Sequence, residues 1–206
     1  MKKLLRLLLV VLSQTPFASH AEFADNFSLV TQYDILHGQS RGAQPFQTGI
    51  ETFQLTDVSI FGAKLNPSQP IALRIYDDFN LSPNSPVSTI FTGTAGAAGF
   101  NDNLGIFIPS VFSNLSITLS PQTRYWLVLE NQSSSDLWFG LTAVQGSAPA
   151  QGTGYLPGSK LSLGLTGSFN LNNSRDYGVR IGAIPEPSSA VLILAAAPLL
   201  FRRRSR

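Results

Sequence analysis

Through much of residues 22–184, apolar residues recur at every second position, which is the side-chain period of a β-strand and not of a helix. Leucine, isoleucine, valine or tyrosine alternates with other residues, mostly small or polar, in the runs 71–76, 115–120, 161–166 and 177–182. A further run, 125–129, is apolar at each position, so we expect a central strand there that is buried on both faces. The sequence therefore limits the choice of fold to sheets with one core-facing side.

Turn-forming residues separate these runs, at Asn66-Pro67, Ser82-Pro83-Asn84, Ser120-Pro121 and Leu156-Pro157-Gly158. Around residues 53–60 the apolar alternation shifts by one position, which indicates a β-bulge. No stretch of the middle segment has the sustained three-and-four spacing of an amphipathic helix. We therefore predict an all-β fold, an antiparallel two-sheet sandwich with jelly-roll-like topology, flanked by an N-terminal signal helix and a short C-terminal hydrophobic helix.

The charge of the chain is unevenly distributed, although its formal net charge is +2. Seven of the fourteen lysine and arginine residues lie in the first 21 positions or the last five. Residues 22–184 retain seven basic residues against eleven acidic ones, which gives a net charge of −4. This segment has no basic stripe of the kind that binds phosphate backbones, so we expect no nucleic-acid partner. The chain also has no cysteine, which excludes disulfides, cysteine nucleophiles and thiolate metal sites.

Residues 1–21 have the three-part layout of a secretory signal peptide. A basic start is followed by an apolar run that only Arg6 interrupts, and then by a polar stretch that ends at Ala21. Small residues at Ser19 and Ala21 suit the narrow subsites of signal peptidase, so we expect cleavage after Ala21. A short buried N-terminal helix is the alternative, but the apolar run has no polar face.

Residues 185–206 combine the tripeptide Pro185-Glu186-Pro187, an apolar stretch that ends at Phe201, and a terminal arginine cluster. As a helix, residues 188–201 would reach about 21 Å, short of the roughly 30 Å hydrocarbon core of a membrane. A proline within this stretch would weaken such a helix further. A permanent membrane anchor is therefore marginal, which favours a transient membrane segment.

In their order and position, these three features resemble the PEP-CTERM sorting signal. Proteins with that signal are substrates of exosortase, an integral-membrane cysteine transpeptidase-like enzyme of Gram-negative bacteria that often make exopolysaccharide. The resemblance implies that Pro185, Glu186 and Pro187 are the recognition element for exosortase and not a catalytic site. The alternative is a plain C-terminal membrane anchor that follows a chance Pro-Glu-Pro.

The basic residues at the two ends of the chain predict the same membrane topology, because basic residues that flank short apolar segments stay on the cytoplasmic side. The N-terminal lysines and the C-terminal arginines would both remain inside, so residues 22–184 would lie across the inner membrane. We expect transient association with the inner membrane before processing. The processed protein is then expected in the cell envelope, at the outer surface or in the extracellular matrix.

Four strand patterns, at 43–49, 55–58, 71–77 and 119–129, occur in an order that resembles the choice-of-anchor domains, most nearly the type labelled R. The resemblance spans residues 25–182. It implies an exported β domain that precedes a sorting signal. That family has no established biochemical activity, so the resemblance bears on location and not on chemistry.

Signatures of enzymes are sparse in this chain. Removal of the signal peptide, which contains His20, leaves His37 as the single histidine, so one chain cannot build a two-histidine metal site. We expect His37 in a surface turn. The chain has neither a Gly-x-Ser-x-Gly nucleophile elbow nor a phosphate-binding glycine loop.

Carboxylates at Asp77-Asp78 and at Asp102 offer the main alternative, an ion site or an enzyme. Oxygen ligands suit calcium, but neither position has the spaced Asp/Asn series of a calcium loop. Both positions follow apolar runs, where polar turns are expected, so we predict solvated turns and no cofactor, with a weak calcium site as the alternative. A glycosidase needs two carboxyl groups opposed across a cleft, and nothing in the spacing of the acidic residues selects a pair.

Four aromatic residues could stack on sugar rings: Tyr125, Trp126, Trp138 and Tyr155. Tyr125 and Trp126 lie in the most apolar run, so we expect both in the core. Trp138 follows the polar segment 133–136 and is the candidate ligand platform, at a strand edge. The sequence thus predicts an exported, non-catalytic envelope or matrix protein whose β domain binds polysaccharide or a partner. An exported carbohydrate-active enzyme is the alternative.

Overall fold

A computed structural model of the protein describes residues 21–50, 53–142, 154, 156, 158–171 and 176–185. In chain order its elements are β1 (Ala21–Asp25), the 3₁₀ helix η1 (Phe27–Leu29), β2 (Val30–Leu36), β3 (Arg41–Gln47), β4 (Phe53–Lys64), β5 (Pro70–Phe79), β6 (Ser82–Thr94), β7 (Pro109–Phe112), β8 (Ile117–Leu119), β9 (Arg124–Asn131), β10 (Leu137–Thr142), β11 (Lys160–Ser162), β12 (Asn170–Leu171) and β13 (Val179–Pro185). The all-β prediction is confirmed for this part of the chain. The two predicted terminal helices fall outside the described residues.

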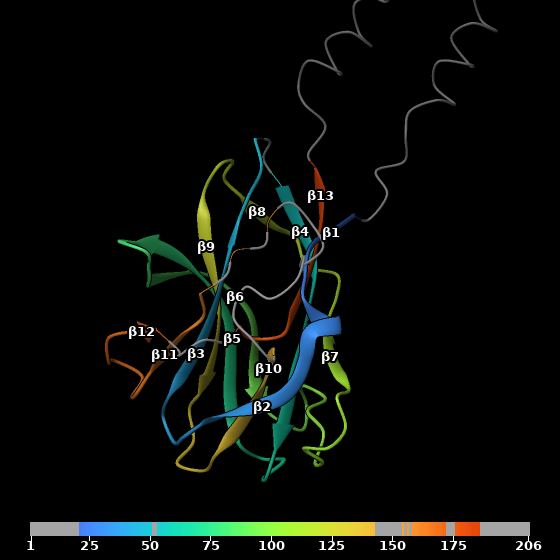
Figure 1. Cartoon of the computed structure of the whole chain (residues 1–206), viewed down its shortest axis with the longest axis vertical. Coiled ribbons are helices and arrows are strands. Elements are labelled where there is room, and N and C mark those ends of the chain that lie inside the picture. The colour runs from blue at the N-terminus through green and yellow to red at the C-terminus, as the bar shows by residue number, and fades with distance from the viewer. Residues whose placement is uncertain are drawn as a thin grey trace, which may run out of the picture.

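Two antiparallel sheets form a sandwich (Figure 1). The first sheet has the strand order β1-β13-β4-β10-β2, and β7 and β8 also pair with β4. The second sheet has the order β12-β11-β3-β9-β5-β6. This arrangement confirms the predicted antiparallel two-sheet sandwich. Within the described ranges, no helix is long and apolar enough to cross a membrane.

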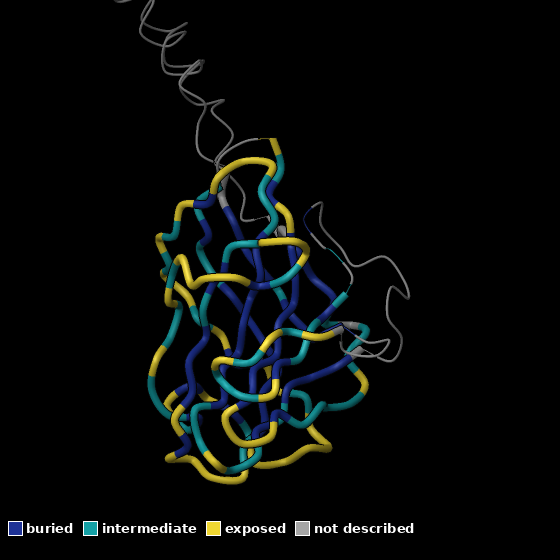
Figure 2. Tube along the Cα trace, turned by 90° about the vertical axis from the view of Figure 1, so that its left-hand side faces the viewer, coloured by how far each residue is buried: buried dark blue, intermediate teal, exposed yellow. Residues whose placement is uncertain are grey.

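The main core lies between the two sheets and is built from alternate residues of each strand. Ile71, Leu73 and Ile75 of β5 are all 0% exposed and face this core, as their spacing predicted. Figure 2 shows the buried strands along the middle of the molecule and the exposed segments at its ends and rim. Burial of each such side chain stabilises the folded state by about 1.5–3 kcal/mol. The apolar side chains that the alternation places in this core are therefore the main source of stability.

The central strand predicted at residues 125–129 is β9, and that prediction is confirmed. It pairs with β3 on one edge and with β5 on the other. All residues from Tyr125 to Asn131 are buried. Because this strand has neighbours on both edges and its side chains are covered on both faces, neither face requires polar residues. This explains its continuous apolar run.

The bulge predicted in residues 53–60 is present in β4. Asp57 pairs with Gly182 of β13, whereas Leu55 pairs with the next residue, Ala183, so Thr56 is the extra residue. This insertion shifts the core-facing positions of β4 by one, from Leu55 to Val58. The apolar phase slip in the sequence is therefore the signature of this bulge.

The turn predicted at Ser82-Pro83-Asn84 was placed wrongly, because the chain reverses at Asn80 and Leu81. Phe79 pairs with Ser82, which leaves a two-residue loop. Asn80 and Leu81 have φ of 52° and 60°, as a type I′ hairpin requires at both central positions. Leucine rarely adopts such a backbone, so the sequence does not signal the turn. Residues 82–84 fit into β6 because this strand lies at the edge of its sheet, where proline is tolerated.

The strand predicted over residues 161–166 is also shorter than expected, since β11 ends at Ser162. Gly164 has φ of 89°, and the N–H of Gly167 donates to its carbonyl oxygen at 3.3 Å. The chain therefore turns away from the sheet, and Leu163 is 71% exposed. The leucines of this run alternate in sequence but do not lie on one buried face, because the run continues from the strand into a turn.

The first and last strands of the described chain are neighbours in the first sheet. Ala21 of β1 pairs with Ala183 of β13, and the two strands run antiparallel. Because of this direction, the start of β1 and the end of β13 lie at the same end of the sheet, as Figure 1 shows. The two predicted processing points are thereby brought close in space.

Candidate functional site

The outer face of the second sheet carries a small buried cluster of its own. Ala43 from β3, Tyr76 from β5, and Trp126 and Val128 from β9 make up this cluster, and the half-buried Phe169 packs against it. Trp126 pairs directly with Tyr76 across β9 and β5, which explains the grouping. Alternate residues of the same strands face the main core, so this cluster lies on the far side of the sheet from the core.

Trp126 is buried, as predicted, but it belongs to the outer cluster and not to the core between the sheets. The residue is 2% exposed, and its Nε1 donates a 2.7 Å hydrogen bond to Oδ1 of Asp78. The Nζ atom of Lys160 lies 5.6 Å from the centroid of the indole ring, within the range of a cation–π contact. Tyr125 points the other way and joins the main core. The indole thus links an acidic and a basic side chain on the outer face.

Two grooves lie on this outer face, and the β5–β6 hairpin lines both. The first has a volume of about 400 Å³ and is lined by Arg41, Phe79 and residues 82–84 and 166–169; we call it the Arg41 groove. The second has a volume of about 350 Å³ and is called the Trp126 groove; its lining residues are Pro45, Asn80, Leu81, Arg124, Trp126, Gly158 and Lys160. In Figure 1 the green tip of the β5–β6 hairpin and the orange strands β11 and β12 project on the same side of the molecule.

Arg41, the first residue of β3, is only 8% exposed. Its Nη2 donates to the carbonyl oxygen of Gly167 at 2.6 Å and to Oγ of Ser162 at 3.2 Å. Its guanidinium carbon lies 4.4 Å from the centroid of the Phe169 ring. Its Nε is buried and has no hydrogen-bond partner among the described residues. The Arg41 groove therefore has a fixed cation in its wall that forms no ion pair with a carboxylate of the described residues.

Glu130 stands opposite Arg41 in the β3–β9 pairing, but its carboxylate is engaged elsewhere. Tyr76 Oη donates to Oε1 at 2.5 Å, Gln132 Nε2 donates to Oε2 at 3.2 Å, and Arg74 Nε lies 3.4 Å from Oε2. Burial raises the pKa of Tyr76, and the hydrogen bond and charge of Glu130 raise it further, whereas Arg41 lowers it. Tyr76 therefore stays protonated at neutral pH and holds Glu130 in place.

Each of the carboxylates considered as calcium ligands has a partner from the protein, although the side chain of Asp102 is 81% exposed. Asp77 Oδ1 accepts a 2.6 Å hydrogen bond from the backbone N–H of Ser85, and Asp78 accepts the indole hydrogen bond described above. Asp102 lies 3.2 Å from Nζ of Lys64. Among the residues that the structure describes, no group of three or more His, Cys, Asp or Glu side chains could hold a metal ion. Asp77 and Asp78 thus shape the β5–β6 hairpin.

Trp138, the predicted ligand platform, lies in β10, which pairs with both β2 and β4. Its strand is interior to the first sheet and is not an edge. Leu137 and Phe139 on either side of it face the core, so the half-buried indole lies on the outer face of that sheet. Its Nε1 is buried without a partner among the described residues. Trp138 lines neither groove, and Tyr155 falls outside the described residues.

The predicted processing residues lie at the limits of the described chain. Ala21, after which signal peptidase is expected to cut, is the first residue of β1. Pro185 is the last residue of β13, and its backbone pairs with that of Phe53. Glu186 and Pro187 fall outside the described residues, as do the signal peptide before Ala21 and the apolar segment with its arginines.

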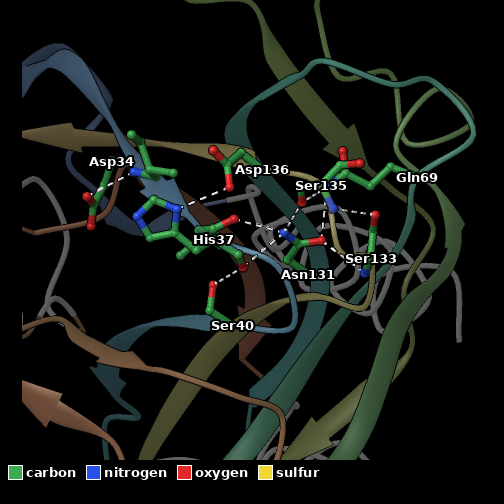
Figure 3. Close-up of polar contacts among 10 residues, drawn as sticks. Asp34, His37, Ser40, Gln69, Asn131, Ser133, Ser135 and Asp136 are labelled. Carbon is green, nitrogen blue, oxygen red and sulfur yellow. Dashed lines mark hydrogen bonds and ion pairs between the residues drawn. The ribbon is translucent and has the colours of Figure 1, made fainter.

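A buried polar network surrounds Asn131 at one end of the sandwich (Figure 3). Asn131 is 0% exposed, and its Nδ2 donates to the backbone oxygens of Leu36, His37 and Ser135 at 2.8, 3.2 and 2.7 Å. Its Oδ1 accepts from Nε2 of Gln69 at 2.9 Å. The network ties the end of β9 to three loops, and its amide nitrogens donate to acceptors within the protein. We assign it a structural role.

His37 borders this network in the turn between β2 and β3 (Figure 3). Its side chain is 64% exposed, and Nδ1 lies 3.1 Å from Oδ1 of Asp136. The position agrees with the surface turn expected from the sequence. An exposed histidine with a single carboxylate neighbour offers no nucleophile to activate and no metal ligand set.

Sequence reasoning missed the side chains that line the two grooves, chiefly Arg41, Phe79, Arg124, Lys160 and Phe169. A signal was present, since Arg41, Arg124 and Lys160 are each the first residue of a strand. A single cation ahead of a strand is common at surfaces, so no one of them stands out. They gather on one face because β11, β3 and β9 are neighbours in the sheet.

No protein-family model matches the chain. No curated protein is similar enough to count as a relative. Among solved structures, the chain is similar to the cysteine protease and lectin-like domains of Cwp84, a surface layer associated protein of Clostridium difficile, with a TM-score of 0.50 and 10% identity over 75% of this chain and 36% of that chain. The clostridial cysteine protease Cwp84 after propeptide cleavage gives a TM-score of 0.49 and 13% identity, over 74% of this chain and 38% of that chain. This chain thus spans little more than a third of the clostridial chain, and the likeness concerns the fold alone.

Proposed function

We propose that this protein is an exported, non-catalytic component of the cell envelope or extracellular matrix, sorted by exosortase, and that its β domain binds polysaccharide. The observation that carries the binding part of the proposal is the pair of grooves on the outer face of the second sheet. In each groove an aromatic ring lies beside hydrogen-bonding side chains.

Sugar rings present a face of C–H groups and a rim of hydroxyls, so a sugar site needs a flat apolar surface with polar groups beside it. Phe79 in the Arg41 groove is 64% exposed, which leaves its ring free to stack. Ser82, Asn84 and Ser168 line the same groove and offer donors and acceptors to hydroxyl groups. The groove thus has both parts of a sugar site.

The engagement of the nearby carboxylates supports binding over hydrolysis. A glycosidase needs two carboxyl groups that face each other across the sugar, one of which must give or take a proton. Asp78 is held by the indole of Trp126, and Glu130 is held by Tyr76, Gln132 and Arg74. The clostridial structure, whose description names a cysteine protease and lectin-like domains, is similar in fold alone and does not choose between binding and hydrolysis.

We include a jelly-roll topology in this proposal. The chain passes from one sheet to the other between β2 and β3, β3 and β4, β4 and β5, β6 and β7, β8 and β9, β9 and β10, β10 and β11, and β12 and β13. Repeated crossing between two antiparallel sheets is typical of jelly rolls, and long hairpins within one sheet are not. The β5–β6 hairpin is the main departure from that pattern.

The pairing of β1 with β13 supports the export and sorting part of the proposal. A domain that is held transiently by segments at both ends must present both ends toward one membrane. Antiparallel pairing puts Ala21 opposite Ala183, at the same end of the sheet, which meets this requirement. The sorting signal itself remains an inference from Pro185-Glu186-Pro187 and the segment that follows.

A glycan-binding screen of the protein and three alanine variants tests the binding proposal. Phe79→Ala should weaken binding at least fivefold and leave stability nearly unchanged, because the side chain is mostly exposed. Leu65→Ala is the matched control, since this residue is 66% exposed and lines neither groove. Trp138→Ala tests the alternative platform on the first sheet.

The outcomes separate the two faces. Loss of binding in Trp138→Ala with normal binding in Phe79→Ala would move the site to the first sheet. Turnover of a polysaccharide that depends on one Asp or Glu would replace the binding proposal with the enzyme alternative. Retention of full affinity in both variants would leave the grooves without a role.

A further inference from the structure

Positive charge is concentrated on the outer face of the second sheet, although residues 22–184 as a whole are acidic. The charged residues of the strands in this sheet are Arg41, Arg74, Asp77, Asp78, Arg124, Glu130 and Lys160. Asp176, which accepts from the backbone N–H of Gly158 in the Trp126 groove, lies outside these strands and is counted with the rest. The strand residues comprise four cations and three carboxylates, whereas the rest of the segment has three basic and eight acidic residues. This sheet is therefore net positive by one charge, and the rest is net negative by five.

The groove cations differ from the other described cations in their partners. Lys64 and Arg180, elsewhere on the domain, each form an ion pair, with N to O distances of 3.2 and 3.0 Å. Arg41, Arg124 and Lys160 form no ion pair with a carboxylate of the described residues. All three line the grooves. Among the residues that the structure describes, the cations without an ion pair are thus those that line the grooves.

Arg41 is the most informative of these residues because it is buried. A buried charge without a counter-charge costs stability unless a partner is supplied. The carboxylate of Glu130, its neighbour across the strands, is already shared by Tyr76 and Arg74. The Nε of Arg41 has no acceptor within the described part of the chain. An acidic group in the Arg41 groove would supply the missing counter-charge.

We propose that the two grooves bind an anionic polysaccharide, with one acidic group at Arg41 and another between Arg124 and Lys160. This inference rests on the proposed polysaccharide binding and adds the charge of the ligand. Carboxylate and sulfate groups both accept charge-assisted hydrogen bonds from arginine and lysine, whereas a neutral glycan leaves these cations unpaired. The rings of Phe169 and Trp126 hold Arg41 and Lys160 in place and leave other N–H groups for the ligand.

Binding of the full chain to three polymers tests the inference. The probes are polygalacturonate, which carries carboxylates, dextran sulfate, which carries sulfates, and neutral dextran. We expect at least one anionic polymer to bind at least tenfold more tightly than neutral dextran. We also expect that affinity to fall when salt is raised from about 50 to about 200 mM, because salt screens the charges.

Charge-removing variants assign the effect to the grooves. Arg124→Gln and Lys160→Gln should each weaken binding about two- to fivefold, and the double variant about tenfold, since these half-exposed cations are partly screened. Arg41→Gln should weaken it about tenfold or more, because its bond to the ligand would be buried. Lys64→Gln removes the same charge away from the grooves and should bind as the parent does. The basic residues at the termini are present in every variant, so they cancel in the comparison.

The results distinguish this inference from the function on which it rests. Equal affinity for neutral dextran, with no loss in the Arg124 and Lys160 double variant, would overturn the anionic ligand and leave polysaccharide binding intact. Binding to none of the three polymers would overturn both. Equally tight binding of poly-L-glutamate, a polyanion without sugar rings, would overturn the assignment to polysaccharide. The double variant involves half-exposed residues, so loss of fold does not confuse these outcomes.

Discussion

Replacement of Asn131 by alanine should be among the most damaging single changes to this fold. The side chain is 0% exposed; the two protons of Nδ2 are shared among three backbone oxygens, and Oδ1 accepts two hydrogen bonds. One of the donors to Oδ1 is the backbone N–H of Ser133, at 3.1 Å. The change leaves these backbone groups and Gln69 with fewer partners at a site without exposure to solvent.

The magnitude follows from the number of bonds. A typical hydrogen bond contributes about 1 kcal/mol net, and a buried group left without a partner costs about 1–3 kcal/mol. Gln69 retains a second acceptor, the backbone oxygen of Ser135 at 2.9 Å, so not every partner is orphaned. We therefore expect a loss of about 3–5 kcal/mol in the free energy of unfolding. For a domain of this size that loss lowers the melting temperature by about 10 °C.

Urea unfolding followed by tryptophan fluorescence measures this loss, with Asn170→Ala as the control. Asn170 is exposed on β12, so its replacement should change the free energy of unfolding by less than about 0.5 kcal/mol. Asn131→Asp should destabilise at least as much as alanine at neutral pH, because a carboxylate oxygen would face three carbonyl oxygens. Protonation at low pH should recover part of that loss. A loss below 1 kcal/mol for Asn131→Ala would refute the reasoning.

Three further predictions concern other parts of the chain. Trp126→Phe should lower the free energy of unfolding by about 2 kcal/mol, because Asp78 loses its indole donor, and urea unfolding at neutral pH would expose an error in this estimate. Residues 22–184 should fold alone and melt cooperatively with or without a chelator, since the core needs no metal or disulfide; a chelator-induced loss of the transition would contradict this. Alanine at residues 185–187 should leave export intact and accumulate a membrane-bound precursor, and mass spectrometry that finds the arginine tail on the mature wild-type protein would rule out sorting at this motif.

For several strands, the sequence by itself indicated both the segment and the side that faces the core. Side chains of a strand alternate whatever its partners are, so Ile71, Leu73 and Ile75 reveal a buried face without knowledge of the sheet. The bulge at Thr56 was visible for the same reason, as a slip in that alternation. The predictions for the two ends of the chain also come from sequence alone, because processing enzymes read short linear motifs.

Local backbone conformation was determined less completely. The turn at Asn80 and Leu81 requires positive φ at both positions, and a leucine at the second of them gives no signal. The end of β11 depends on Gly164, whose positive φ turns the chain away before Leu163 can join the sheet. At Asn80 and Leu81 the pairing of β5 with β6 overrides the local pattern, whereas at Gly164 a local turn does so.

Only the tertiary structure decided where the candidate site lies. Arg41, Trp126 and Lys160 are far apart in the sequence, and each is unremarkable in its own segment. They converge because β3 lies between β9 and β11. Trp126 faces outward because its neighbours Tyr125 and Leu127 face the core. The order of strands in a sheet depends on how the strands pack across the whole domain. An alternation of apolar residues within one segment does not indicate which other strands pair with it.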